Sequence, residues 1–369
     1  MAEQLAVCRE LLSSGSVPKA RMAIILLDQL ADALIFRRCD LAYSIWEDRA
    51  WMRQHHPRYG RAEKRRATRN FERRIEIAQA LDQHCPGDPE DPMIRDGDAA
   101  ILRITHRYRN LAHHRDRHNP QVVPVLARVL FRAVVDMWVR GYRRGSAVGH
   151  SGIKARLAEV GIEGLGSSSD PDFGHPGEWL NFREDANRVR TALLPEVEIE
   201  DENVRVVLAV DLDDRIGELL SGIDYLPDGR ERVNGLVEWF QFWDTHGADD
   251  ELIESEAARD VVGRLVAEGE SRRAEIEAEA TAANARYFAR LETLRREWNP
   301  KPATEVIANA NEATEKLMEA LTLEESLLLY EPVDRGLDGV ERVIRDAIHQ
   351  FDEWVNMQVH DMRIERIGD

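Results

Sequence analysis

The residues best able to do chemistry stand together between Arg107 and His118, in the stretch RYRNLAHHRDRH. It holds four arginines, three histidines and one asparagine. Imidazole exchanges protons near neutral pH, and a guanidinium binds phosphate through paired N–H groups. Together, these groups could cut a phosphodiester bond without a metal ion.

A helix must position these residues, and its period of about 100° per residue sorts them onto two faces. The apolar face collects Ile101, Ile104, Tyr108, Leu111 and Ala112. The other face collects Arg103, His106, Arg109, Asn110, His113 and His114, with Arg107 at its edge. Because Arg109 and His114 lie off the apolar face, replacing either is expected to leave the melting temperature nearly unchanged.

The segment Arg109-Asn110-Leu111-Ala112-His113-His114 resembles the signature of the HEPN superfamily, which is Arg, a polar residue and then His after a spacing of four to six. The resemblance covers roughly residues 18–145, where three further helical segments are predicted. It implies a metal-independent endoribonuclease that often acts as a dimer, with both motifs lining one cleft. It says nothing about the remaining residues.

The resemblance also implies roles for the motif residues. One histidine takes the proton of the 2′-hydroxyl, an arginine neutralises charge on the phosphoryl oxygens, and Asn110 orients the histidine or the phosphate. We assign His114 as the proton carrier and Arg109 as the phosphate ligand. These two lie about 140° apart on a straight helix, so the pairs Arg109/His113 and Arg107/His114 stay open. The arginines expected to bind RNA nearby are Arg103, Arg115 and Arg117.

A metal site is the competing hypothesis for the same residues. The possible ligands are His113, His114, Asp116 and His118. His114 and His118 have the four-residue spacing of metal ligands on a helix. However, Asn119-Pro120 is predicted to end the helix there, and no HExxH-type glutamate accompanies them. We therefore predict neither a metal nor another cofactor.

Two other acidic segments offer weaker candidate sites. Residues 166–172 faintly resemble a nucleotidyltransferase loop, but the Gly-Ser to Asp-x-Asp distance is too short, so a linker is favoured. Residues 207–214 could form a strand that presents Asp211 and Asp213 to a cation. Continuation into RIGELLSGI favours a helix instead.

Composition favours a soluble cytoplasmic protein. No apolar run approaches the roughly 18 residues of a membrane span, and the first residues lack the features of a signal peptide. Cys8, Cys39 and Cys85 follow no metal-ligand pattern, which indicates reduced thiols.

The net charge of −18 is unevenly distributed along the chain. Residues 1–150 carry 26 Lys and Arg against 18 Asp and Glu, a net charge of +8, and the remainder carries 24 against 50, a net charge of −26. A basic half can bind a polyanion such as RNA, whereas an acidic half would compete for the basic surface. Alternatively, the same difference in net charge would arise from two domains whose solvated surfaces merely differ in composition.

The apolar periodicity predicts an all-α fold throughout. Helices are expected at 1–13, 20–52, 61–83 and 99–114, the last capped by Asp98, and after Asn119-Pro120. We divide the chain into a basic HEPN-like four-helix bundle (1–145), an irregular linker (146–200) and an acidic helical domain (201–369). That domain is predicted to hold helices at 203–222, 229–246 and 334–364, and a long antiparallel coiled-coil-like hairpin of 249–298 with 303–330.

The leading interpretation is an endoribonuclease of HEPN type, a toxin or phage-defence effector by analogy. It would bind RNA, dimerise through the N-terminal bundle and meet a regulatory protein through its acidic half. The alternative is a non-catalytic HEPN-like module that binds RNA or protein, with the coiled coil as a scaffold.

Overall fold

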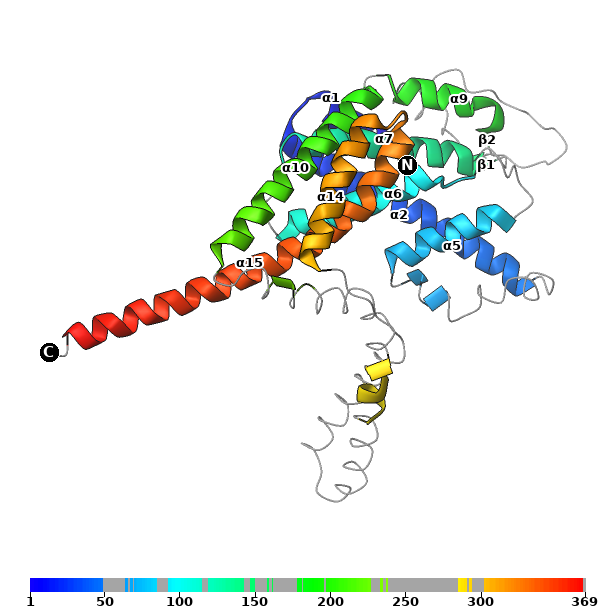
Figure 1. The fold of residues 1–369 in the computed structure, drawn as a ribbon. Coiled ribbons are helices and arrows are strands. Elements are labelled where there is room, and N and C mark those ends of the chain that lie inside the picture. The colour runs from blue at the N-terminus through cyan, green and yellow to red at the C-terminus, as the bar shows by residue number, and fades with distance from the viewer. Residues whose placement is uncertain are drawn as a thin grey trace. The chain divides into compact units, whose positions relative to one another are not determined.

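The computed structural model describes the chain at residues 1–48, 64–65, 67–68, 70–84, 92–114, 119–142, 147–149, 158, 161, 178–180, 182–195, 197–226, 233–234, 237, 285–290, 292–293 and 302–367. Over these residues the fold is all-α, as predicted (Figure 1). The helices are α1 (Ala2–Ser13), α2 (Val17–Asp48), α5 (Phe71–His84), α6 (Asp96–His114), α7 (Val122–Tyr142), α9 (Phe182–Leu193), α10 (Asp201–Tyr225), α14 (Ala303–Glu319) and α15 (Leu323–Ile367). None of them is long and apolar enough to cross a bilayer.

The chain divides into two compact units. The first comprises Met1–Asp211 and Ala313–Pro332, and the second comprises Leu212–Glu312 and Val333–Asp369. The first unit therefore takes a short segment of the acidic half, namely the end of α14 and the beginning of α15. The candidate site lies in this unit.

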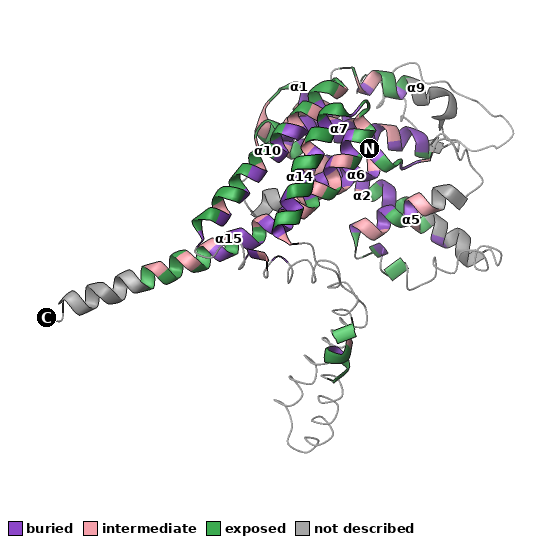
Figure 2. Ribbon diagram, viewed as in Figure 1, coloured by how far each residue is buried: buried purple, intermediate pink, exposed green. Residues whose placement is uncertain are grey.

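The core of the first unit forms where α7 packs against α1, α2, α6 and α9 (Figure 2). The sequence of α7, VVPVLARVLFRAVVDMWVRGY, is apolar on nearly every side, as expected for a helix that other helices surround. Leu126, Leu130, Phe131, Val134 and Met137 of α7 are fully buried. Helices α2 and α6 also pack on each other, and α5 packs on α2.

Helices are present in each segment predicted in the first 145 residues, but the predicted helix 61–83 is interrupted at Asn70, and α5 begins at Phe71. Asn70 Oδ1 accepts the Arg73 N–H at 3.1 Å, as an N-cap does. The arrangement of these helices as a HEPN bundle stays a prediction.

One cap differs from expectation. Helix α6 begins at Asp96, so Asp98 lies inside its first turn, where its Oδ2 accepts the Arg95 N–H at 2.9 Å and an N–H of Arg140. Asp98 is the third residue of the helix, and its carboxylate accepts the backbone N–H of the residue just before the helix, as the third residue of a capping box does. Burial raises the pKa of Asp98.

Residues 146–200 contain regular structure where an irregular linker was predicted. Strands β1 (Ala147–Gly149) and β2 (Glu178–Leu180) pair antiparallel, with Val148 opposite Trp179. Helix α9 follows and packs on α7. The chain-breaking residues end before α9, and its Val189 and Leu193, four residues apart, are buried.

The predicted helix 303–330 is wrong in its extent. Helix α14 ends at Glu319, and α15 begins at Leu323 and runs on through Pro332 without the predicted break near 334. Thr322 Oγ1 accepts the Glu325 N–H at 3.1 Å, and Glu325 Oε2 accepts the Leu321 N–H at 2.9 Å. This reciprocal capping starts a new helix. Because 249–284 and 294–301 lie outside the described residues, the coiled-coil hairpin stays a prediction, as does most of the helix 229–246.

Candidate functional site

A buried carboxylate from α2 joins two residues of the motif helix α6. Asp28 is fully buried, and its Oδ1 lies 3.0 Å from His106 Nδ1 while its Oδ2 lies 2.5 Å from Arg109 Nη1. An isolated buried carboxylate would be costly, so these two partners are what make Asp28 tolerable there. We call Asp28, His106 and Arg109 the α2–α6 cluster.

The geometry assigns the tautomer of the His106 ring. An ionised carboxylate only accepts hydrogen bonds, so Nδ1 must donate to Asp28 and carries the hydrogen. Among the described residues Nε2 has no hydrogen-bond partner, and it is not one of the buried unsatisfied atoms, so it reaches solvent. In the neutral ring this exposed nitrogen can accept a proton.

Phe71 of α5 fixes the plane of the same ring. The two rings stack with centroids 4.1 Å apart and planes 14° apart. Arg74, one turn later, lies over the Phe71 ring and pairs with Asp32 of α2 at 2.6 Å. Three helices therefore hold His106 in one orientation.

Arg109, the predicted phosphate ligand, is already bonded within the chain. Besides the bond to Asp28, its Nη2 donates to Asn110 Oδ1 at 3.2 Å. Its side chain keeps 27% of its surface exposed, while Asp28 keeps none. The prediction that replacing Arg109 leaves stability unchanged is therefore not supported by its environment, since a buried carboxylate depends on it.

Arg107 also has an acidic partner. Its Nη1 lies 2.8 Å from Glu331 Oε1 of α15, and both side chains are mostly buried. In the first turn of α6, about three turns before the motif, the Gly97 N–H lies 3.4 Å from Glu324 Oε1. A Cβ at Gly97 would lie only 3.0 Å from Glu324 Cγ, so a glycine allows this close approach. The start of α15 thus contacts α6 at two points, Gly97 and Arg107.

The remaining predicted residues are placed to different degrees. Arg103 is half-buried and has no ion-pair or hydrogen-bond partner within the described part of the chain, and Asn110 is exposed. His113 and His114 belong to the last turn of α6, but their side chains lie outside the description. Arg115 and Arg117 fall outside the described residues, as do Asp116 and His118 of the metal hypothesis.

A scan against protein-family models and searches among curated proteins and solved structures find no match to this chain. The interpretation of the site therefore depends on its own geometry.

Sequence reasoning missed Asp28 as a site residue and did not select His106. A signal for Asp28 was available, because it shares the apolar spacing of Ile24, Ala31 and Ile35 in the predicted helix, all of which are buried. An acid at a core position requires a partner. For His106 the signal was weaker, since only its place on the polar face distinguished it.

The described regions leave out Asp116, His118 and the side chains of His113 and His114, so the metal hypothesis lies outside them. Within them, no group of three or more His, Cys, Asp or Glu side chains is placed to hold a metal ion. Asp211 lies in α10, as the favoured helical interpretation required, and accepts the Tyr330 hydroxyl at 2.6 Å. Burial raises the pKa values of the Cys8 and Cys39 thiols to about 12, which leaves both protonated.

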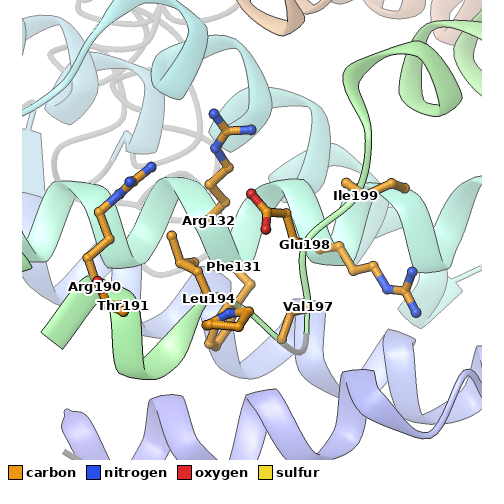
Figure 3. Close-up of a pocket in the computed structure, with 10 residues that line it drawn as sticks. Phe131, Arg132, Arg190, Thr191, Leu194, Val197, Glu198 and Ile199 are labelled. Carbon is orange, nitrogen blue, oxygen red and sulfur yellow. The ribbon is translucent and has the colours of Figure 1, made fainter. Parts of the chain in front are cut away.

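A separate small pocket of about 170 Å³ lies between α7 and the segment after α9 (Figure 3). Three arginines contribute to it, but Arg190 pairs with Asp136 at 2.6 Å and Arg132 with Asp201 at 3.4 Å. The hydrogen bond to Asp136 raises the pKa of Arg190 further. With Glu198 also lining the pocket, its charges are largely balanced, so it lacks the excess positive charge of an anion site.

Proposed function

We propose that this chain is a metal-independent endoribonuclease in which α6 supplies the catalytic groups. The observation that carries the proposal is the α2–α6 cluster, because Asp28 fixes an imidazole and a guanidinium three residues apart on one helix. Arg109 would neutralise charge on the phosphoryl oxygens, and His114 would take the proton of the 2′-hydroxyl. Arg103, Arg115 and Arg117 would hold the RNA backbone, and Arg107 stays the alternative phosphate ligand.

Partners and biological role belong to the same proposal. The HEPN resemblance supports a homodimer through the N-terminal bundle, with His113 or His114 of either copy completing the cleft. It also supports a cytoplasmic toxin or phage-defence effector. A protein that binds the acidic half would then regulate cleavage.

A second candidate function, an RNA-binding or protein-binding module that does not cut, is favoured by one specific observation. Two of the motif arginines already face carboxylates, Arg109 at Asp28 and Arg107 at Glu331. Their charges are thus compensated within the fold, as in a structural ion-pair network.

Incubation of the purified protein with total RNA in excess EDTA separates the two functions. The endoribonuclease cuts RNA under chelation, and replacing Arg109 abolishes the cutting. A binding module retains intact RNA in a gel shift at every protein concentration. His349→Gln is the matched control, because His349 is an exposed histidine that lies 3.4 Å from Glu353 outside the motif.

A further inference from the structure

Cleavage through the 2′-hydroxyl requires two proton transfers. A base removes the hydroxyl proton, and an acid must protonate the departing 5′ oxygen, because an alkoxide is a poor leaving group. The proposed function assigns the first task to His114 and assigns no residue to the second. The chain needs a second proton carrier close to the phosphate.

His106 has the properties of that second carrier. Its Nδ1–H is bonded to Asp28 at 3.0 Å, its ring stacks on Phe71 and its Nε2 reaches solvent. The bond to Asp28 is available in both protonation states, since Nδ1 keeps its hydrogen in each. Nε2 can therefore gain and lose a proton while the ring keeps its orientation.

The helix also supplies a cation for the phosphate next to this nitrogen. Arg103 lies three residues before His106, within one turn of the same face. It has no partner among the residues that the structure describes. Arg103 could therefore hold a phosphate within one helical turn of His106.

We propose that His106 is the general acid of the ribonuclease and that Asp28 is its positioning residue, an inference that rests on the proposed function. The 2′ oxygen loses its proton to the base and forms a bond to phosphorus. The bond from phosphorus to the 5′ oxygen breaks, and its electron pair stays on that oxygen. The proton on Nε2 of the His106 imidazolium moves to the 5′ oxygen. The base then releases its proton to solvent, and the neutral His106 ring takes one up from solvent, so no net proton is consumed.

A substrate that needs no acid tests this role in the full-length protein. Two short RNAs are compared, one ordinary and one with sulfur in place of the 5′ bridging oxygen at the cleavage site. A thiolate leaves without being protonated, because its pKa is far below that of an alcohol. His106→Gln should lose about 10²- to 10⁴-fold in rate on the ordinary RNA, and less than about tenfold on the sulfur-containing RNA.

Two further variants serve as controls. His106→Phe can stack on Phe71 but carries no transferable proton, so it should lose as much rate as His106→Gln on each RNA. If one of the two variants fails to fold, the other still gives the result. His349→Gln should cut both RNAs at the wild-type rate. NMR of histidine-labelled wild-type protein should show the hydrogen of neutral His106 on Nδ1, a readout that requires no activity.

Each other outcome has a definite meaning. An equal loss on both RNAs makes His106 a structural residue and overturns the inference, as does full activity of His106→Gln or a neutral tautomer with its hydrogen on Nε2. A wild-type protein that cuts neither RNA overturns the proposed function itself. If the wild type cuts both RNAs, the proposed function stands, and only the behaviour of the His106 variants decides the inference.

Discussion

At the scale of single residues, Asp28 distinguishes the candidate site from an ordinary basic helix face. It has no solvent exposure, and its two described partners are both on α6. A solvated cationic face needs no such support. If Arg109 binds phosphate as proposed, the same carboxylate couples stability to function, because any change to Arg109 alters both the charge available for phosphate and the balance of a buried ion.

Replacing Arg109 should therefore destabilise the protein. Arg109→Ala leaves the buried Asp28 with only His106, at an expected cost of about 3 kcal/mol in the free energy of unfolding of the first unit. The double variant with Asp28→Asn should recover part of that loss, since no buried charge remains. Urea unfolding followed by tryptophan fluorescence measures both.

The control for this prediction is Asp40→Asn. Asp40 pairs with Lys64 at 3.1 Å, but both side chains are about half exposed, so the cost should stay below about 1 kcal/mol. If Arg109→Ala matched Asp40→Asn, the pair with Asp28 would contribute nothing beyond a surface salt bridge.

The two described cysteines should be unreactive. With pKa values near 12, Cys8 and Cys39 hold about a thousandfold less thiolate at pH 7.5 than thiols at the usual value of 9.0. Iodoacetamide should label them only in urea, and mass spectrometry of the labelled peptides reports this. Rapid labelling of either in the folded protein would contradict the burial described for α1 and α2.

At the scale of elements, the positions of the N-terminal helices were predictable, and several of their ends were not. The period of Ile24, Leu27, Ala31 and Ile35 predicts α2 because one helix face is buried along its length. The break between α14 and α15 depends instead on one local sequence, Thr322-Leu-Glu-Glu325, which is a capping box inside an apolar repeat that otherwise suggests continuity.

That capping box yields a test. Thr322→Ala removes the acceptor of the Glu325 N–H and should cost about 1 kcal/mol, mostly as faster amide hydrogen exchange in the first turn of α15. Ser13→Ala is the control, because the Ser13 hydroxyl only bonds the Arg9 carbonyl within α1. Equal exchange at residues 323–326 in the wild type and Thr322→Ala would show that the break has another cause.

At the scale of the whole molecule, the charge split predicted competition between the acidic half and RNA. The structure gives this idea a particular contact, since Glu331 pairs with Arg107 across 224 positions in the chain. No pattern in the sequence could choose that partner, because both helices carry many charges. A fragment that ends near residue 145 would lose this contact together with α9 and part of the first unit's core, so a single substitution is the cleaner probe.

Glu331→Gln should strengthen RNA binding. It removes the negative charge that faces Arg107, which keeps its bond to the Glu331 backbone carbonyl. Affinity for RNA at low salt should therefore rise by about two- to fivefold, and the gain should shrink as salt screens the charges. Fluorescence anisotropy with labelled RNA measures the dissociation constants. Glu319→Gln makes the same change of charge at the exposed end of α14, and a gain equal to that of Glu331→Gln would show that only net charge matters.

If α6 cuts RNA through the 2′-hydroxyl, as proposed, the chemistry of the product ends must show it. Purified protein is incubated in EDTA with an RNA of mapped cleavage site and with the same RNA carrying one 2′-deoxy nucleotide at that site. We expect a 2′,3′-cyclic phosphate and a 5′-hydroxyl from the first RNA, and no cleavage of the second. Fragments with 5′-phosphates, or cleavage that stops when EDTA is added, would contradict the account.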